Sequence, residues 1–112
     1  MMLTDGRFGS PYMAMDFYAK IYRLDGEVML AACDRTLRGR TFEDGRLVLD
    51  VKKEFYGDEL FGSEGISPLL EQATIANLVG EEIIAHAVKL GIVEMDHVLW
   101  VDGVPHAQMV RF

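Results

Sequence analysis

Alternating apolar and polar positions predict a strand over residues 16–23. Phe17, Ala19 and Ile21 share one face of this strand. The opposite face carries Tyr18, Lys20 and Tyr22. Leu24-Asp25-Gly26 follows, and Asp-Gly favours a tight hairpin because both residues tolerate positive φ. The next run, residues 28–33, is apolar on both faces, so we expect a central strand covered on each side.

The middle of the chain predicts a short turn and a second hairpin. Asp34 is a plausible N-cap for one helical turn over 35–38, closed by Gly39 in a left-handed conformation. Arms at 40–42 and 46–51 are joined by residues 43–45. The inward side chains of the second arm are expected to be Leu47, Leu49 and Val51. Residues 55–62 have aromatics between glycines and no period, which favours an ordered loop.

Two helices are predicted next. Ser67-Pro68 is a typical helix start, a capping hydroxyl followed by proline at the first helical position. The apolar stripe of this helix is Leu69, Leu70, Ala73 and Ala76. The pattern weakens over 77–80 and resumes over 81–90, with Gly91 ending the second helix. The inward positions of that helix are Ile83, Ile84, Ala87 and Leu90.

The tail returns to strands at 98–101 and 106–111, joined by a turn at Asp102-Gly103. Strands, two helices and strands in this order predict an α+β domain. Its sheet is mainly antiparallel and made of hairpins, and the two helices pack on one face. We assign the single domain to residues 16–112. Residues 1–15 carry glycine, serine and proline without a period, and they are expected to form a flexible leader.

Composition narrows the class of protein. The chain has 112 residues and a hydrophobic share of 50%, enough for one core without metal or disulfide. Cys33 is the single cysteine, which excludes an internal disulfide and a thiolate zinc site within one chain. No apolar run is long enough for a membrane span, and no secretory signal is present. We expect a cytoplasmic protein without a membrane partner or a cofactor.

Charge is unevenly distributed along the chain. The net charge is -7. Residues 1–53 hold 9 Lys/Arg against 8 Asp/Glu, whereas residues 54–112 hold 2 against 10. The acidic half argues against non-specific binding to nucleic acid, which requires many cations facing phosphates. These counts still allow a local basic patch within residues 1–53.

Asn77 is the first candidate for chemistry. It lies where one predicted helix stops and the next begins, so it would cap the second helix or take the left-handed turn that ends the first. The alternative is an anion site formed by Asn77 and the amides near Gly80. Glu81 and Glu82 weaken that alternative, because carboxylates already occupy the positive end of the helix dipole.

His106 and Gln108 share one face of the last strand, at a spacing of two. Together they could bind a planar polar ligand, or His106 could act as an acid or base. The structural alternative is a histidine bonded to a neighbouring carbonyl at the sheet edge. Elsewhere, His86 follows Glu82 by one helical turn, which predicts a surface pair, and His97 follows Asp96 at a strand start.

Cys33 and Asp34 form another candidate. A cysteine at a strand end beside an aspartate is nucleophilic if a cation such as Arg35 lowers its pKa. A cysteine that ends an apolar strand is more often an inert core residue. The three histidines have no spacing that matches a metal-ligand set, so no metal site is predicted.

Basic and aromatic residues suggest a nucleic-acid surface. The arginines of the short turn and second hairpin are expected to cluster beside the polar face of the first strand. This set comprises Arg35, Arg38, Arg40, Arg46, Tyr18, Lys20 and Tyr22. Such residues can stack bases and hold phosphates, although the same set also fits an ordinary solvated sheet surface.

Five short motifs resemble the archaeal Domain of Unknown Function 424 family. In chain order they are Ala31-Ala32-Cys33-Asp34, Gly39-Arg40-Thr41-Phe42, Phe55-Tyr56-Gly57, residues 73–81 and residues 103–108. The resemblance covers residues 17–112, and the segment before Asp16 is an addition to the usual pattern. It implies an archaeal cytoplasmic protein without an established activity, and it assigns no catalytic residue.

Our leading expectation is a small binding domain, not an enzyme, associated with RNA or a ribonucleoprotein through the arginines and tyrosines. One alternative is a small-molecule-binding protein or enzyme that uses His106, Gln108 and Asn77, with Cys33 or Asp34 in reach. Another is a homo-oligomer that buries its methionine-rich and aromatic surface against a copy of itself.

Overall fold

The first hairpin follows the alternation in the sequence. In the computed structural model, which describes residues 16–111, β1 (Phe17–Leu24) pairs antiparallel with β2 (Glu27–Asp34). Asp25 and Gly26 form the turn, with φ of 47° and 84°. Residues 30–34 of β2 are buried, so the strand predicted to be central is deep in the sheet. The leader predicted for residues 1–15 lies outside the described residues.

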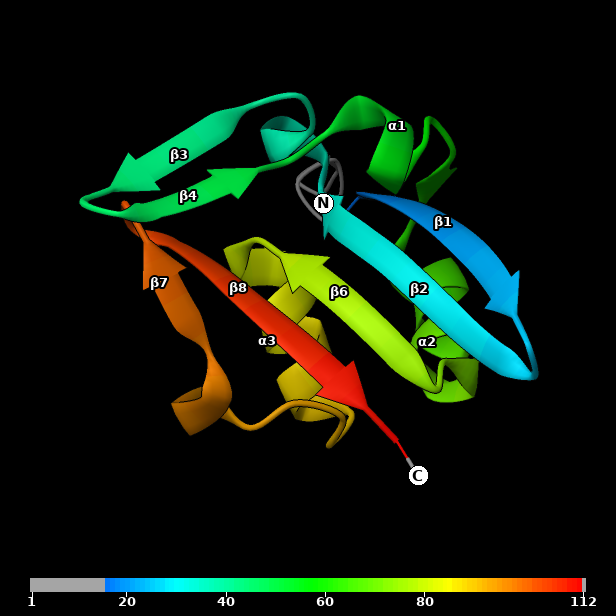
Figure 1. Cartoon of the computed structure of the whole chain (residues 1–112). Helices are drawn as coiled ribbons and strands as arrows, with labels where there is room; N and C mark the ends of the chain where they lie inside the picture. The colour runs from blue at the N-terminus through cyan, green and yellow to red at the C-terminus, as the bar shows by residue number, and fades with distance from the viewer. Residues whose placement is uncertain (1–15, 112) are drawn as a thin grey trace, which may run out of the picture.

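Six strands form the main sheet, in the order β5-β1-β2-β6-β8-β7 (Figure 1). The remaining members are β5 (Leu60–Phe61), β6 (Ile75–Val79), β7 (Leu99–Val101) and β8 (Val104–Val110). β2 and β6 are parallel, and every other neighbouring pair is antiparallel. The fold is therefore α+β with a mostly antiparallel sheet, as predicted.

β6 corrects the helix predicted to extend through Ala76. Residues 75–79 form a central strand, paired with β2 on one side and β8 on the other. Ala76, Leu78 and Val79 are buried. A short apolar run covered on both faces lacks the alternation of a strand, so its pattern alone cannot be separated from that of a helix.

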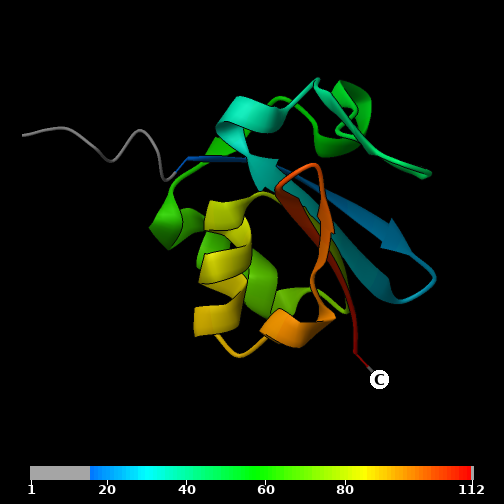
Figure 2. The ribbon, with the colours of Figure 1, turned by 90° about the vertical axis from the view of Figure 1, so that its left-hand side faces the viewer.

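Two helices cover one face of the sheet, as Figure 2 shows. α3 (Glu81–Lys89) agrees with the prediction and buries Ile83, Ile84 and Ala87. α2 (Ser63–Gln72) begins four residues before the predicted start at Ser67. Pro68 therefore lies inside the helix, where its ring removes one backbone donor. Phe61, Ile66 and Leu70 pack here with the inner side chains of β1 and β2.

A smaller layer covers part of the opposite face. It consists of the hairpin β3 (Thr41–Asp44) with β4 (Leu47–Asp50) and the short helix α1 (Lys53–Tyr56). Two features correct the sequence prediction. The loop expected over 55–62 contains the end of α1 and all of β5, which pairs with β1. Leu47, predicted to face inward, is 42% exposed because it lies next to the hairpin turn, while Leu49 and Val51 are buried.

Residues 16–111 also contain two 3₁₀ turns, at Arg35–Leu37 and Met95–His97. Gly39 follows the first turn with φ of 87°, the left-handed conformation expected from the sequence. Among the helices of residues 16–111, none is long and apolar enough to cross a membrane.

Candidate functional site

The face of the sheet opposite α2 and α3 carries three rows of neighbouring side chains. Strand register defines them, since paired residues on adjacent strands point to the same side. The upper row contains Tyr18, Cys33, Val79, His106 and Leu99. The middle row contains Lys20, Ala31, Asn77 and Gln108. The lower row contains Tyr22, Met29, Ile75 and Val110.

The smaller layer covers only part of these rows. Cys33 and Val79 of the upper row are fully buried beneath β3, β4 and α1. In Figure 1 this layer lies at one end of the sheet, and the remaining lengths of β2, β6 and β8 face the viewer uncovered. We define the open face as Asn77, His106 and Gln108 with the lower row. Gln108 and Val110 are exposed, and Asn77, His106, Ile75 and Met29 are partly exposed.

A polar pair occupies the centre of the open face. His106 Nε2 and Asn77 Oδ1 lie 2.8 Å apart, and the Tyr56 hydroxyl donates to the same oxygen at 3.5 Å. Because Oδ1 only accepts, this network assigns the proton to Nε2 and leaves Nδ1 of a neutral His106 as an acceptor. Burial lowers the pKa of His106 from 6.5, which favours the neutral ring. The Asn77 amide group keeps its two donors.

Asn77 has neither of the two roles considered from the sequence. It lies within β6, three residues before the N-cap of α3, which is Gly80. The N-terminus of α3 is instead occupied by Asp34. Its Oδ2 accepts from Glu82 N at 3.0 Å, and its Oδ1 accepts from Ile83 N at 2.8 Å. The chain's own carboxylate thus fills the place considered for an external anion.

Asp34 also corrects the predicted cap of the turn at 35–38, because its side chain makes no bond to that turn. The sequence could not identify α3 as the partner of Asp34. The two are far apart in the chain, and the parallel pairing of β2 with β6 brings them together. Burial, with smaller contributions from nearby Glu82 and Glu81, raises the pKa of Asp34 from 3.8 to about 6. The bonds from Glu82 and Ile83 oppose this shift because they stabilise the carboxylate.

Cys33 lies in the apolar layer between the sheet and α1. It is fully buried, and burial raises the pKa of its thiol to about 12, with a further contribution from Asp34. Arg38 lowers this pKa by less than burial raises it. The thiol is therefore protonated and shielded, which are the properties of a core cysteine.

A cationic groove adjoins the open face beside α1. Lys20, Arg38 and Lys53 line it together with Glu54, Gly57 and Asp58, and it encloses about 350 Å³. The Arg38 guanidinium lies 4.6 Å from the centre of the Tyr18 ring and donates to Gly57 O. Lys20 Nζ lies 5.2 Å from the centre of the Tyr22 ring. Lys20 and Arg38 are thus held by aromatic rings and carbonyls, and no carboxylate among residues 16–111 neutralises the three cations by an ion pair.

The predicted arginine cluster is divided by the structure. Arg35 pairs with Asp16 at 3.5 Å, and Arg40 lies 4.9 Å from the centre of the Phe42 ring. Of the predicted arginines, Arg38 lines the groove, and Arg46 lies at the β3–β4 turn.

Lys53, Phe55 and Tyr56 also belong to this region, and the sequence pattern does not reveal them because residues 55–62 have the pattern of a loop although α1 ends at Tyr56. Phe55 stacks on Tyr22 with ring centres 5.6 Å apart, and the Tyr22 hydroxyl donates to Phe55 O at 2.7 Å. The signal available was the aromatic pair Phe55-Tyr56, which follows Lys52 and Lys53 with only Glu54 between.

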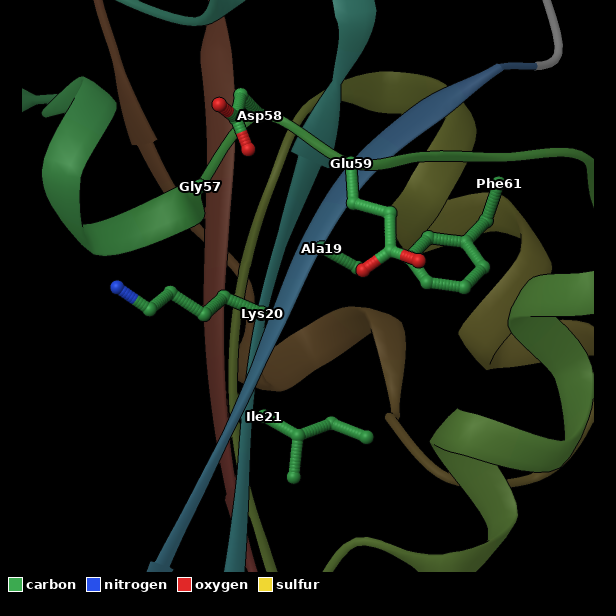
Figure 3. A pocket seen from close by; sticks show the side chains of 7 residues that line it. All are labelled: Ala19, Lys20, Ile21, Gly57, Asp58, Glu59 and Phe61. Atoms are coloured by element: carbon green, nitrogen blue, oxygen red, sulfur yellow. The ribbon is translucent and has the colours of Figure 1, made fainter.

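A second groove follows the outer edge of β1. It encloses about 360 Å³ and is lined by Ala19, Lys20, Ile21, Gly57, Asp58, Glu59 and Phe61 (Figure 3). In this view Lys20 and Ile21 point to opposite sides of β1, and the groove runs between the strand and the segment that leads into β5. It is separate from the open face.

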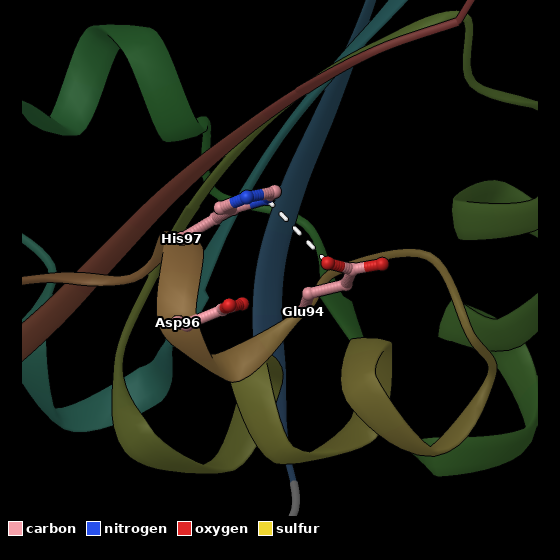
Figure 4. Close-up of side chains that lie close together, drawn as sticks. All are labelled: Glu94, Asp96 and His97. Atoms are coloured by element: carbon pink, nitrogen blue, oxygen red, sulfur yellow. Dashed lines mark ion pairs between the residues drawn. The ribbon is translucent and has the colours of Figure 1, made fainter.

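Two further polar groups lie on the helical side. The sequence suggested that His86 pairs with Glu82, and the structure corrects this. His86 Nε2 lies 2.7 Å from Ser67 Oγ and so joins α3 to α2. Glu94, Asp96 and His97 gather at the second 3₁₀ turn, with their ligand atoms within 4.8 Å of one another (Figure 4). All three are exposed, and His97 Nδ1 lies 4.0 Å from Glu94 Oε1.

Comparisons with known proteins agree with the fold. A family model described as "Protein of unknown function (DUF424)" matches residues 22–112. No curated protein matches the chain. A solved structure of an uncharacterized conserved protein from Methanopyrus kandleri is similar, with a TM-score of 0.69 and 22% sequence identity. The match covers 87% of this chain and 95% of that one, and it supports the shared fold alone.

Proposed function

The chain belongs to the DUF424 family of proteins of unknown function, and from the geometry of its open face we propose that it binds single-stranded RNA in the cytoplasm. One observation carries the proposal. Apolar side chains, side-chain amides that donate to no residue from 16 to 111, and a cationic groove lie on the same side of one sheet. Single-stranded RNA requires this combination, because its bases need surface to lie on and its phosphates need cations.

The distribution of charge supports the same side. Residues 63–97, which contain α2 and α3, carry six carboxylates and only one lysine, Lys89. The groove cations Lys20, Arg38 and Lys53 lie across the sheet from these helices. A polyanion approaching the protein is therefore repelled by the helical side and attracted to the open side.

The open face can also contact bases. Met29, Ile75 and Val110 provide apolar surface on three adjacent strands. Next to them, Gln108 offers a donor and an acceptor, and Asn77 keeps its amide donors beyond its bond to His106. An unpaired base on the lower row would then bring its edge toward the middle row. A duplex hides these edges, so the proposal is specific for single strands.

The groove is tested by removing its charges. Lys20→Ala/Arg38→Ala/Lys53→Ala should weaken binding of a fluorescent single-stranded oligoribonucleotide by at least tenfold, measured by anisotropy. The slope of log affinity against log salt should fall by about 0.7 for each lost phosphate contact. The matched control Arg23→Ala/Arg46→Ala/Lys89→Ala removes the same charge elsewhere and should change affinity far less. Equal losses in the two triple variants would contradict a groove site.

A second candidate function rests on the Asn77–His106 hydrogen bond. A neutral histidine held by an amide, with Gln108 beside it, also suits a small planar ligand or an acid-base reaction, as considered from the sequence. Competition between free nucleosides and the oligoribonucleotide distinguishes the two candidate functions. Free nucleosides at millimolar concentration should not displace the oligoribonucleotide if phosphate contacts dominate, whereas full displacement favours the small-molecule function.

A further inference from the structure

The lysines of the cationic groove lie against glycines. Lys53 crosses Gly39, where an added Cβ would lie 2.7 Å from Lys53 Cε. Lys20 packs in a similar way on Gly57, where an added Cβ would lie 3.3 Å from Lys20 Cβ. Both glycines have positive φ, of 87° and 76°, a conformation that a side chain would strain. The groove therefore positions its lysines before a ligand arrives, which reduces the conformational entropy that binding costs.

Each cation of the groove keeps donors for a ligand. Arg38 donates from Nε to Gly57 O, which leaves the two terminal nitrogens of its guanidinium without an acceptor among residues 16–111. Lys20 Nζ donates to Glu54 O at 3.2 Å and keeps its other hydrogens. Lys53 forms no ion pair with any residue from 16 to 111. A phosphate monoester suits these donors, because it offers three acceptor oxygens and a charge of about -2 near pH 7. An internal phosphodiester carries one charge only.

The groove lies at one end of the open face. Strand register places Lys20 in one row with Ala31, Asn77 and Gln108. Two strand spacings separate Lys20 from Asn77, which is about 10 Å. The open face itself contains no lysine or arginine. A nucleic-acid strand that lies on this face therefore meets cations at one of its ends.

Carboxylates lie on the far side of the groove. Asp58 lines both the cationic groove and the second groove at the outer edge of β1. Glu59 lines the second groove, on the opposite side of β1 from Lys20 (Figure 3). A strand that continued past Lys20 and across β1 would bring its next phosphate to these two carboxylates, which would repel it. The cationic groove is thus suited to the last phosphate of a strand.

We propose that the cationic groove binds a terminal phosphate of the single-stranded RNA whose adjoining bases lie on the open face. The inference rests on the proposed function and narrows its ligand to a phosphorylated strand end. Lys20 and Lys53 neutralise the phosphate, and the two terminal nitrogens of Arg38 donate to two of its oxygens. The 5′ and 3′ ends of RNA can both carry this group, and the chemistry that the groove recognises is the same for each.

Calorimetric titration of the full chain tests the inference with one short single-stranded oligoribonucleotide in three forms. One form has a 5′-phosphate, one has a 3′-phosphate, and one has hydroxyl groups at both ends. At least one phosphorylated form should bind about tenfold more tightly than the hydroxyl form, because one further charge-assisted hydrogen bond contributes roughly that factor. The form that gains affinity identifies the end. Equal affinity of all three forms overturns the inference and leaves RNA binding intact, whereas no binding of any form contradicts the proposed function as well.

A pair of neighbouring lysines locates the phosphate. Lys53→Met should remove most of the preference for the phosphorylated end, because it removes one of the three groove cations. Lys52→Met is the matched control, since Lys52 is exposed, adjacent in the chain and outside the groove lining, and it should keep the preference. Circular dichroism checks that both variants fold. A preference that persists unchanged in Lys53→Met, or falls equally in both variants, overturns the assignment of the phosphate to this groove.

Discussion

Asp34 shows how one side chain fixes the relative position of distant elements. It ends β2, and its carboxylate binds the first amides of α3, 48 and 49 residues further along the chain. Only 8% of the residue is exposed, so these bonds replace those that water would make. The sequence indicates that Asp34 is a cap, but not which helix it caps. That partner depends on a parallel strand pairing between segments far apart in the chain.

Replacing Asp34 with alanine should therefore destabilise the protein by about 1–3 kcal/mol, since it leaves two amides at a helix start without acceptors. Urea denaturation followed by circular dichroism gives the free energy of unfolding. Thr36→Ala is the control and should cost little, because Thr36 is an exposed neighbour whose side chain makes no hydrogen bond to any residue from 16 to 111. Equal stability of the two variants would show that the cap contributes nothing.

His106 makes stability depend on pH in a defined direction. Burial lowers the pKa of His106 below 6.5, and the side chains that contact it, Asn77 and Tyr56 through the shared network, carry no charge. As the pH falls through 6.5, the unfolded chain takes up a proton that the folded ring resists. The unfolded state then binds more protons, so stability from His106 is present at high pH and is lost on acidification.

The test compares wild type with His106→Gln, which cannot be protonated. Between pH 8 and pH 5 the wild type should lose stability relative to the variant, measured by urea denaturation at each pH. His86 and Asp34 also titrate with shifted pKa values, but they are present in both proteins and cancel in the difference. A pH-independent difference would contradict the buried neutral ring.

At the scale of elements, β1 and α3 could be predicted because their side chains follow one period and end at clear signals. β2 is apolar on both faces, but the Asp25-Gly26 turn that joins it to β1 marks it as the second strand of a hairpin. β6 could not be predicted, because a central strand between two others is apolar on both faces and its alanines suit a helix equally well. Ser67-Pro68 misled for a related reason. Its local pattern is that of a helix start, yet Ile66 and Leu70 pack into the core and draw the helix back to Ser63.

The junction between β6 and α3 depends on Gly80. Its φ is 122°, and an added Cβ would lie 2.3 Å from the Asp34 carboxyl carbon. Gly80→Ala should therefore cost about 3 kcal/mol or more in the free energy of unfolding, from backbone strain and displacement of the cap. Thermal and urea denaturation measure this loss.

Gly62→Ala is the matched control, because Gly62 precedes α2 with φ of -85° and nothing lies within 4 Å of its added Cβ. It should cost no more than about 1 kcal/mol. If Gly80→Ala proved as mild as this control, the close contact between Gly80 and Asp34 would not exist in solution.

At the scale of the whole molecule, the class of fold was accessible from the order of elements, but the candidate site was not. The site depends on which strands are neighbours. Asn77 lies near His106 because β6 pairs with β8, and Lys20 shares their row because β2 lies between β1 and β6. The sequence paired His106 with Gln108 on one strand face and offered Asn77 as a further polar group, but it did not show that Asn77 lies beside them. The sequence also could not place α1, whose Tyr56 hydroxyl donates to Asn77 Oδ1 beside His106.

The most direct test of the account is a titration of the isotopically labelled protein with a short single-stranded oligoribonucleotide, followed residue by residue in NMR spectra. Amides of the open face and the groove, in β1, β6, β8 and α1, should shift in a saturable manner while those of α2 and α3 stay unchanged. Shifts confined to α2 and α3, or no saturable shift at moderate salt, would contradict the proposal that this face binds RNA.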